Sequence, residues 1–301
     1  MGFANNSYLI NELEVCNFRK FESISVEFER QLTVLIGDNG VGKSTLIDAA
    51  SIALGTLFQK IENAKAPGIT PDDARGAVIK QGDMFDVQSR YPVMIGADGI
   101  VLGENEHWSR SLNTAKGRAT IADAAAVVDA GARLQELVGS GDTVVLPILA
   151  RYGTDRLWTR TEPKDQSLPN RTRGYEGALQ ASSNDARMNA WFKSQSIWEW
   201  QNRRDSALFS AVKRALASCF DAAASTVDAM VDFDAELGQL VFTYSTADGS
   251  YHRDRIHSMS DGYRGTLSLF ADIAYRMAML NPALGERVLE TPGVVMIDEI
   301  D

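Results

Sequence analysis

A glycine-rich stretch constrains the fold of this chain most strongly, namely Gly37-Asp38-Asn39-Gly40-Val41-Gly42-Lys43-Ser44. It fits the pattern G-x-x-x-x-G-K-[ST], in which glycines let backbone N–H groups surround a phosphate and a following helix N-terminus adds a favourable dipole. An apolar, β-branched run at residues 32–36 precedes it and predicts a buried strand. Apolar residues at helical spacing predict a helix from Ser44 to about Gln59. A chance glycine turn is the alternative, but both flanks favour a phosphate site.

Residues of this glycine-rich loop (residues 37–44) have expected chemical roles. Lys43 is expected to reach the β- and γ-phosphates of a nucleotide, and the Ser44 hydroxyl to ligate Mg²⁺. Thr45 follows in the first helical turn and is counted with the nucleotide-contacting residues. The loop therefore predicts binding of a nucleoside triphosphate with its metal ion.

An apolar segment followed by two carboxylates supplies the second motif. Val294–Ile297 predicts a strand, and Asp298 and Glu299 follow it directly. Asp298 is expected to hold Mg²⁺, directly or through water, and Glu299 to orient and deprotonate an attacking water. An apolar strand that ends in two carboxylates is common by itself. With the glycine-rich loop it becomes specific, because both motifs should sit at one edge of the same sheet. Glu299 and Lys43 are the predicted catalytic residues.

Composition narrows the class of protein. The 301 residues are 45% hydrophobic, enough for a sizeable core, and the net charge of −10 gives no global attraction to nucleic acid or anionic membrane. The two cysteines, Cys16 and Cys219, have no C-x-x-C spacing, which fits a reducing cytosol. No apolar run approaches the roughly 20 residues of a membrane span, and no signal peptide is recognisable. We therefore expect a cytoplasmic protein with no membrane partner.

The remaining secondary structure is predicted from local patterns. Alternation predicts strands at residues 9–18 and 24–28, which indicate an antiparallel sheet near the N-terminus. The dipeptides Asp98-Gly99 and Asp248-Gly249 predict hairpin turns. Other expected elements are a buried strand at 143–149 and helical stretches at 121–138, 184–220 and 258–280. The last of these begins in an S-D-G-Y segment, where Ser260 or Asp261 is expected to cap the helix.

Three groups of basic residues have two open interpretations each. Arg19 and Lys20 follow a strand and could be plain surface charges. Residues 151–173 carry six basic and three acidic side chains, so this loop could meet phosphates or be merely solvated. The stretch 184–220 mixes aromatic with basic residues, which could stack on bases or form a helix-packing face with snorkelling charges.

Together these motifs resemble the ABC-type ATPase head of the SMC, RecF and OLD group. Asn17-Phe18-Arg19 resembles the early N-F-R element of that group, whose arginine lies near bound nucleotide. The segment 259–263 is similar to the ABC signature, usually L-S-G-G-Q. This resemblance implies that Ser260 and Gly262 contact the γ-phosphate bound by the opposite subunit. Asp261 and Tyr263 depart from the usual signature.

A closer resemblance extends along almost the whole chain, to stand-alone bacterial ATPases that include those of Septu and retron anti-phage systems. It rests on Y-G-T-D-R-L-W at 152–158, D-I-A-Y-R at 272–276 and T-P-G-V-V-M-I-D-E-I-D at 291–301. It implies an α/β P-loop NTPase of ABC type, with a mixed central sheet, an N-terminal antiparallel β subdomain and a helical subdomain carrying the signature. We expect one domain made of residues 1–60, 61–257 and 258–301. Its C-terminal remainder, with a switch histidine, is expected past Asp301.

The resemblance also implies a function and partners. ATP and Mg²⁺ are the implied cofactors, and a homodimer or higher homo-oligomer would close around ATP. Hydrolysis would switch DNA or a nuclease partner of the HNH type, in anti-phage defence or DNA repair. The alternative is a nucleotide-gated scaffold with little turnover that holds a nuclease or toxin. A transporter ATPase subunit is disfavoured, because no glutamine-loop context is recognisable.

Overall fold

The computed structural model describes residues 7–81, 84–153, 170–180, 185–234, 236 and 238–299. The chain forms two compact units, and each is described by itself. The first comprises residues 1–151 and 292–298, and the second comprises residues 152–291 and 299–301. Among the described residues, no helix combines the length and apolar character needed to cross a bilayer.

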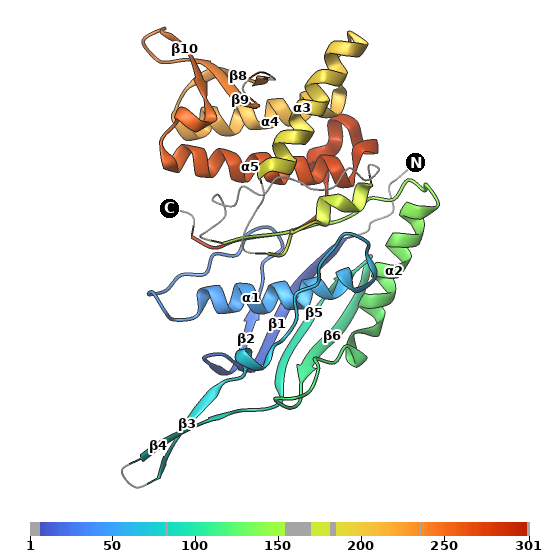
Figure 1. The fold of residues 1–301 in the computed structure, drawn as a ribbon, viewed down its shortest axis with the longest axis vertical. Coiled ribbons are helices and arrows are strands. Elements are labelled where there is room, and N and C mark those ends of the chain that lie inside the picture. The colour runs from blue at the N-terminus through green and yellow to red at the C-terminus, as the bar shows by residue number, and fades with distance from the viewer. Residues whose placement is uncertain are drawn as a thin grey trace. The chain divides into compact units, whose positions relative to one another are not determined.

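The first unit is built on a four-stranded antiparallel sheet with the order β2-β1-β5-β6 (Figure 1). Its strands are β1 (Tyr8–Phe18), β2 (Phe21–Glu27), β5 (Val93–Val101) and β6 (Glu104–Leu112). The α-helices α1 (Lys43–Leu54) and α2 (Ala125–Gly139) and the short 3₁₀ helices η1 (Gly55–Lys60), η2 (Pro71–Asp73) and η3 (Ala122–Ala124) complete this region. The predicted α/β class, the N-terminal antiparallel sheet and both of these α-helices are confirmed.

Buried polar groups fasten α1 to this sheet. The Tyr8 hydroxyl donates to the Leu54 carbonyl at 3.1 Å, and the Trp108 indole N–H donates to the Ala53 carbonyl at 3.1 Å. Both aromatic side chains are almost completely buried, so each satisfies its polar atom on the last turn of the helix. The helix that follows the glycine-rich loop is therefore fixed at its C-terminal end.

The predicted hairpin at Asp98-Gly99 is wrong, because β5 runs through this dipeptide without a turn. The pairing of β1 with β5 shifts register between Ile10 and Glu12, opposite Gly99. A Cβ atom at Gly99 would collide with the Leu9 carbonyl oxygen, so glycine here permits a close approach of the bulged strand. The turn lies instead at Leu102 and Gly103, whose φ angles are 50° and 94°.

The predicted strand at residues 32–36 is also wrong. These residues form no strand, and Leu32, Val34 and Ile36 are 75%, 65% and 90% exposed. An extended segment becomes a strand only when a neighbour accepts its hydrogen bonds. Within the described part of the chain no strand pairs with residues 32–36, so this segment joins no sheet and its apolar side chains remain in water.

Two further strand pairs complete the first unit. Strands β7 (Ile148–Tyr152) and β11 (Gly293–Ile297) form one two-stranded sheet, which confirms the strand expected before Asp298. The strand predicted at residues 143–149 begins only at Ile148, because Pro147 has no N–H for a ladder. Strands β3 (Gly76–Gln81) and β4 (Met84–Ser89) form an exposed hairpin.

The second unit packs three helices against a three-stranded antiparallel sheet. The helices are α3 (Asp185–Asn202), α4 (Ala207–Ala224) and α5 (Asp261–Leu280), and the strands are β8 (Val227–Asp234), β9 (Gln239–Ser245) and β10 (Tyr251–Arg255). The 3₁₀ helices η4 (Arg171–Tyr175), η5 (Ile256–Ser258) and η6 (Pro282–Glu290) connect them. The predicted hairpin at Asp248-Gly249 is confirmed by the pairing of β9 with β10.

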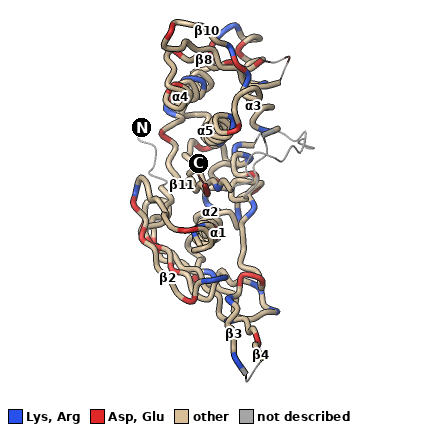
Figure 2. Tube along the Cα trace, turned by 90° about the vertical axis from the view of Figure 1, so that its left-hand side faces the viewer, with Lys and Arg blue, Asp and Glu red and all other residues tan. Residues whose placement is uncertain are grey.

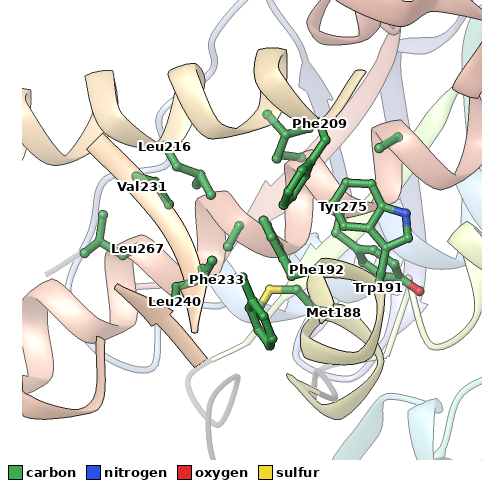
Figure 3. Close-up of a cluster of buried hydrophobic side chains, with 14 of the residues drawn as sticks. Met188, Trp191, Phe192, Phe209, Leu216, Val231, Phe233, Leu240, Leu267 and Tyr275 are labelled. Carbon is green, nitrogen blue, oxygen red and sulfur yellow. The ribbon is translucent and has the colours of Figure 1, made fainter. Parts of the chain in front are cut away.

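Aromatic side chains dominate the core of the second unit (Figure 3). Trp191 makes edge contacts with Phe192 and Phe209 at centroid distances of 5.1 and 5.7 Å. The packing-face interpretation therefore holds for the N-terminal half of α3. Trp200 is 80% exposed and lies outside this core. The stretch predicted as helical at 184–220 is two helices, because Arg203 adopts a φ angle of 51° and Ser206 caps α4. Most of the predicted basic loop, residues 154–169, lies outside the described residues.

Candidate nucleotide-binding site

The glycine-rich loop has a backbone that only glycine adopts easily at two positions. Gly40 and Gly42 have φ angles of 80° and 113°, and Lys43 begins α1 directly afterwards. A Cβ atom at Gly42 would lie 2.5 Å from the Phe21 ring and 2.8 Å from the Lys20 side chain. Another residue at this position would therefore be excluded both by backbone strain and by its neighbours.

Lys43 lies over this loop. Its Nζ donates to the Gly37 carbonyl at 2.5 Å and to the Asp38 carbonyl at 3.0 Å, in a solvent-exposed setting. Ser44 and Thr45 occupy the first turn of α1, which contains no acidic residue. The free N–H groups of that turn and the lysine charge together favour an anion.

Arg19, the predicted nucleotide contact, is held by two carboxylates. Its Nε donates to Asp73 Oδ1 at 2.9 Å, and its Nη1 contacts Asp48 Oδ2. Its backbone N–H also donates to the Asp73 carbonyl at 2.6 Å. Burial by itself lowers the pKa of Arg19, but the hydrogen bonds and charges of Asp48 and Asp73 outweigh it and raise the pKa.

Asp48 joins three segments of the first unit. It lies on α1, one turn after Ser44, and its Oδ1 contacts Arg151 while its Oδ2 contacts Arg19. Arg151 belongs to β7 and follows the buried residues of that strand. Sequence reasoning missed Asp48 and Asp73 as site residues, and it considered Arg151 only as part of a basic loop that could meet phosphates. The spacing of four residues from Ser44 was the one available signal, since it places Asp48 on the same face of the helix.

Lys20, interpreted from sequence as a possible surface charge, contacts the glycine-rich loop. Its Nζ donates to the Gly40 carbonyl, and its stem lies beside Gly42. The turn that contains Arg19 and Lys20 therefore presents one cation to α1 and the next cation to the loop.

The carboxylate pair lies at the end of β11. Asp298 is 8% exposed, and Met296 of the same strand approaches the Ser51 hydroxyl of α1 at 3.8 Å. Glu299 is exposed and has a φ angle of 56°, which is uncommon for a residue other than glycine. The first unit thus contains the glycine-rich loop, Arg19 and Asp298, whereas Glu299 is grouped with the second.

The signature-like segment opens α5 in the second unit. Ser260 occupies the N-cap position, but its side chain makes no capping hydrogen bond, so the predicted cap is wrong in that respect. Asp261 instead pairs with Arg264 at 2.7 Å on the helix surface. Among the described residues, none would lie within 4 Å of a Cβ atom at Gly262, so none of them fills the space beside the start of this helix.

The Ser44 hydroxyl and the Asp298 carboxylate are oxygen donors, which suit Mg²⁺. Among the described residues, no three His, Cys, Asp or Glu side chains gather into a metal cluster. Mg²⁺ fits this arrangement, because it is commonly held by phosphate oxygens, water and one or two protein oxygens. Charge elsewhere is mixed, since Lys and Arg are interspersed with Asp and Glu along both units (Figure 2).

Comparison with known proteins identifies relatives of this chain. It is 21% identical to "Retron Ec83 probable ATPase" of Escherichia coli over 97% of this chain and 63% of that protein. It is 22% identical to "Septu protein PtuA" of Bacillus mycoides (strain KBAB4) over 97% of this chain and 34% of that protein. A shorter match, 49% identical over 62 residues, covers 19% of this chain and 11% of "DNA repair protein RecN" of Bacillus subtilis (strain 168). The chain thus spans less than two thirds of the length of each of these relatives.

A solved structure and a family profile complete the comparison. The SMC head domain from Thermotoga maritima superposes with a TM-score of 0.45 and 12% identity, over 96% of this chain and 89% of that one. The profile described as "AAA domain" matches residues 12–207, which is more than half of the chain. The chain therefore belongs to the AAA domain family, and parts of it are similar to the RecN, Rad50 and RecF repair proteins.

Proposed function

We propose that the glycine-rich loop binds ATP with Mg²⁺ and that the protein hydrolyses it. The observation that carries this proposal is the loop itself, with two glycines at positive φ leading directly into α1 and Lys43 folded over it. Phosphate oxygens are stronger acceptors than carbonyls, because they are charged. A bound triphosphate would therefore draw Lys43 from the carbonyls of Gly37 and Asp38.

Each predicted residue has a role in this proposal. Ser44 and Asp298 would hold Mg²⁺, which when bound neutralises charge on the phosphates. Lys43 would stabilise the charge that develops on the transferred phosphoryl group, and Glu299 would orient the attacking water. Nucleotide contacts are proposed for the remaining loop residues Asp38, Asn39 and Val41, together with Thr45 and the backbone N–H groups of the first turn.

We further propose that two copies close around ATP, with Ser260 and Gly262 of one copy contacting the γ-phosphate bound by the other. Two observations support this arrangement. The Ser260 hydroxyl makes no capping hydrogen bond to its own helix, and no described residue fills the space beside Gly262. Binding would then stabilise a dimer, and hydrolysis would release it. Such a cycle lets an ATPase switch a partner between two states.

The names of the relatives suggest the process. One is a retron ATPase and another a Septu protein, while RecN, Rad50 and RecF are repair proteins. We propose that this ATPase acts in the cytoplasm in anti-phage defence or DNA repair, and that its partner is DNA or an HNH-type nuclease. Because the chain spans only part of each relative, partner identity is best tested by purification from cells that contain the neighbouring genes.

Two measurements test the core of this proposal. ATP binding to the chain is measured by competition with a fluorescent ATP analogue, and Lys43→Ala is expected to abolish it. Glu299→Gln is expected to retain binding and to accumulate a dimer in ATP, measured by light scattering. A Glu299→Gln chain that stays monomeric in saturating ATP contradicts the dimer, whereas a wild-type chain that does not bind ATP contradicts the function.

A nucleotide-gated scaffold with little turnover is the second candidate. It is favoured by the exposed Glu299 side chain and by Asp261, which pairs with Arg264 where the usual signature has a glycine. Phosphate release measured with and without DNA separates the two functions. Binding without turnover in either condition supports the scaffold, and turnover that DNA accelerates supports the switching ATPase.

A further inference from the structure

We propose that Lys20 is a second phosphate-contacting lysine of the glycine-rich loop, and that Arg19 is a positioning residue that holds Lys20 there. The inference rests on the proposed function, because it concerns the same nucleotide. It changes the assignment made from sequence, in which Arg19 contacts the nucleotide and Lys20 has no assigned role.

The Arg19 guanidinium already forms ion pairs with two protein carboxylates. One edge faces Asp48 of α1 and the other faces Asp73, and the side chain retains 40% exposure. Leaving both carboxylates to meet a phosphate would break two ion pairs beside a polyanion, and among the described residues Asp48 would then be held by Arg151 alone and Asp73 by Thr70 alone. Arg19 is therefore better placed to fix the turn than to bind the nucleotide.

The turn that contains Arg19 and Lys20 is fixed from several directions. The Arg19 N–H donates to the Asp73 carbonyl at 2.6 Å, and the Arg75 N–H donates to the Asn17 carbonyl at 2.9 Å. Asp73 is itself held, since its Oδ2 accepts from the Thr70 N–H at 2.8 Å and from the Thr70 hydroxyl at 2.9 Å. A turn anchored in this way presents the next side chain in a defined direction.

Lys20 is in direct contact with the glycine-rich loop. Its Nζ donates to the Gly40 carbonyl, and its stem lies 2.8 Å from the position of a Cβ atom on Gly42. Phe21 lies 2.5 Å from that same position. Lys20 and Phe21 therefore lie directly on the segment whose backbone is shaped for phosphate.

The ammonium groups of Lys20 and Lys43 both donate to neutral carbonyls of the loop. Lys20 is bonded to the Gly40 carbonyl, and Lys43 to those of Gly37 and Asp38. In the part of the chain that the structure describes, neither lysine has a carboxylate within ion-pair distance. Lys20 is exposed and Lys43 is partly exposed, and both carry their charge on a flexible stem, so each can exchange a neutral acceptor for a phosphate oxygen.

The test compares neutral and charge-conserving variants. Lys20→Met is expected to weaken ATP binding by roughly 10- to 100-fold, the range for loss of one charge-assisted hydrogen bond. Lys20→Arg is expected to stay within a few-fold of wild type. Lys80→Met, which removes an exposed lysine of β3, is the matched control and should not change affinity.

The salt dependence of binding separates contact from positioning. Removing an ionic contact with the ligand reduces the dependence of affinity on salt, because fewer charges interact across the interface. Lys20→Met is therefore expected to flatten the plot of log Kd against log salt. Arg19→Gln should weaken binding and lower the melting temperature, yet keep the wild-type slope. Competition by ADP and AMP shows whether the lost affinity follows the number of phosphates.

The outcomes decide between the assignments. If Lys20→Met binds ATP as tightly as Lys80→Met, the inference is overturned, and Lys20→Gln checks the result with a second neutral side chain. A flattened slope for Arg19→Gln instead of Lys20→Met returns the nucleotide contact to Arg19. Loss of binding in Lys43→Ala, with wild-type binding intact, keeps the proposed function in either case. Circular dichroism confirms that each variant is folded.

Discussion

Each unit of the protein contains a cluster of arginine and aspartate, and the two clusters differ in how completely they are enclosed. In the second unit Asp272 and Arg276 pair at 2.7 Å with side chains that are each 6% exposed. In the first unit Asp48 joins Arg19 and Arg151, and these side chains are 16–40% exposed. The enclosed cluster can serve only the fold, whereas water and ligands can reach the open one.

Hydrogen bonds satisfy the enclosed cluster on every side. The Tyr152 hydroxyl donates to Asp272 at 2.7 Å, and Arg276 donates to the carbonyls of Gly174 and Glu176 at 2.9 and 3.1 Å. Burial alone lowers the pKa of Arg276, but Asp272 and the neighbouring tyrosines outweigh it and raise the pKa. In the open cluster Arg151 Nε is itself buried and has no hydrogen-bond partner among the residues that the structure describes. This cluster is therefore satisfied less completely than the enclosed one.

The largest expected effect comes from breaking the enclosed cluster. Asp272→Ala would leave the Arg276 charge buried without its carboxylate, and we expect a loss of about 3–5 kcal/mol in the free energy of unfolding. Urea denaturation followed by circular dichroism measures it. Asp261→Ala removes a carboxylate that is 84% exposed, so this control should change stability by less than about 0.5 kcal/mol. Equal effects in the two variants would remove the distinction between enclosed and open pairs.

The next effect concerns ligand affinity rather than stability. Lys43→Ala is expected to weaken ATP binding by at least roughly 100-fold, because the loop loses its principal phosphate cation. Its melting temperature should stay close to that of wild type, since the residue is partly exposed and its amine, among the described residues, donates only to loop carbonyls. Titration with ATP and a thermal scan of the same sample measure both. A variant that melts early would make Lys43 part of the fold.

Asp48→Asn tests the open cluster directly. The amide keeps the shape of the carboxylate but removes the charge that both arginines share, and we expect a stability loss of about 1 kcal/mol. Affinity for ATP should fall several-fold, because Arg19 would fix the turn at Lys20 less firmly. Denaturation and ATP titration of one preparation give both numbers. A stability loss as large as that of Asp272→Ala would show that exposure does not separate the two clusters.

The limits of sequence reasoning follow from the same contrast. The glycine-rich loop, α1, α5 and β11 could be predicted because their signals are local: fixed spacing, helical periodicity and an apolar run before Asp298. The continuous strand through Asp98-Gly99 could not be predicted, because the conformation there depends on a bulge in β1, which is far away in the sequence. Likewise residues 32–36 have the composition of a buried strand, but pairing depends on a neighbour.

The site shows the same limit. Lys43, Ser44 and Asp298 are recognisable by motif, whereas Asp73 and Arg151 come from segments without a motif of their own. Only the folded chain brings them to Arg19 and Asp48. The direction of Lys20 is likewise set by the hydrogen bonds of its neighbours, which no spacing rule reports.

The smallest expected effect is an alkaline weakening of the second unit. Burial raises the pKa of Tyr275, on the same helix as Asp272 and Arg276, to about 12 from an ordinary value near 10. The folded state therefore keeps this proton longer than the unfolded state does. Stability is full below about pH 10 and declines between about pH 10 and 12, at up to about 1.4 kcal/mol per pH unit for each such group.

Tyr275→Phe should make this decline shallower, because the variant has one fewer tyrosine whose unfolded form ionises first. Urea denaturation at intervals of half a pH unit from about pH 8 to 11.5 measures the slope. Tyr152 shares the behaviour, since burial and then the charge of Asp272 raise its pKa, so the variant should keep part of the decline. Curves for variant and wild type should run parallel below pH 9. Identical slopes above pH 10 would mean that Tyr275 ionises equally easily in both states, and that the enclosed cluster excludes water less completely than its burial indicates.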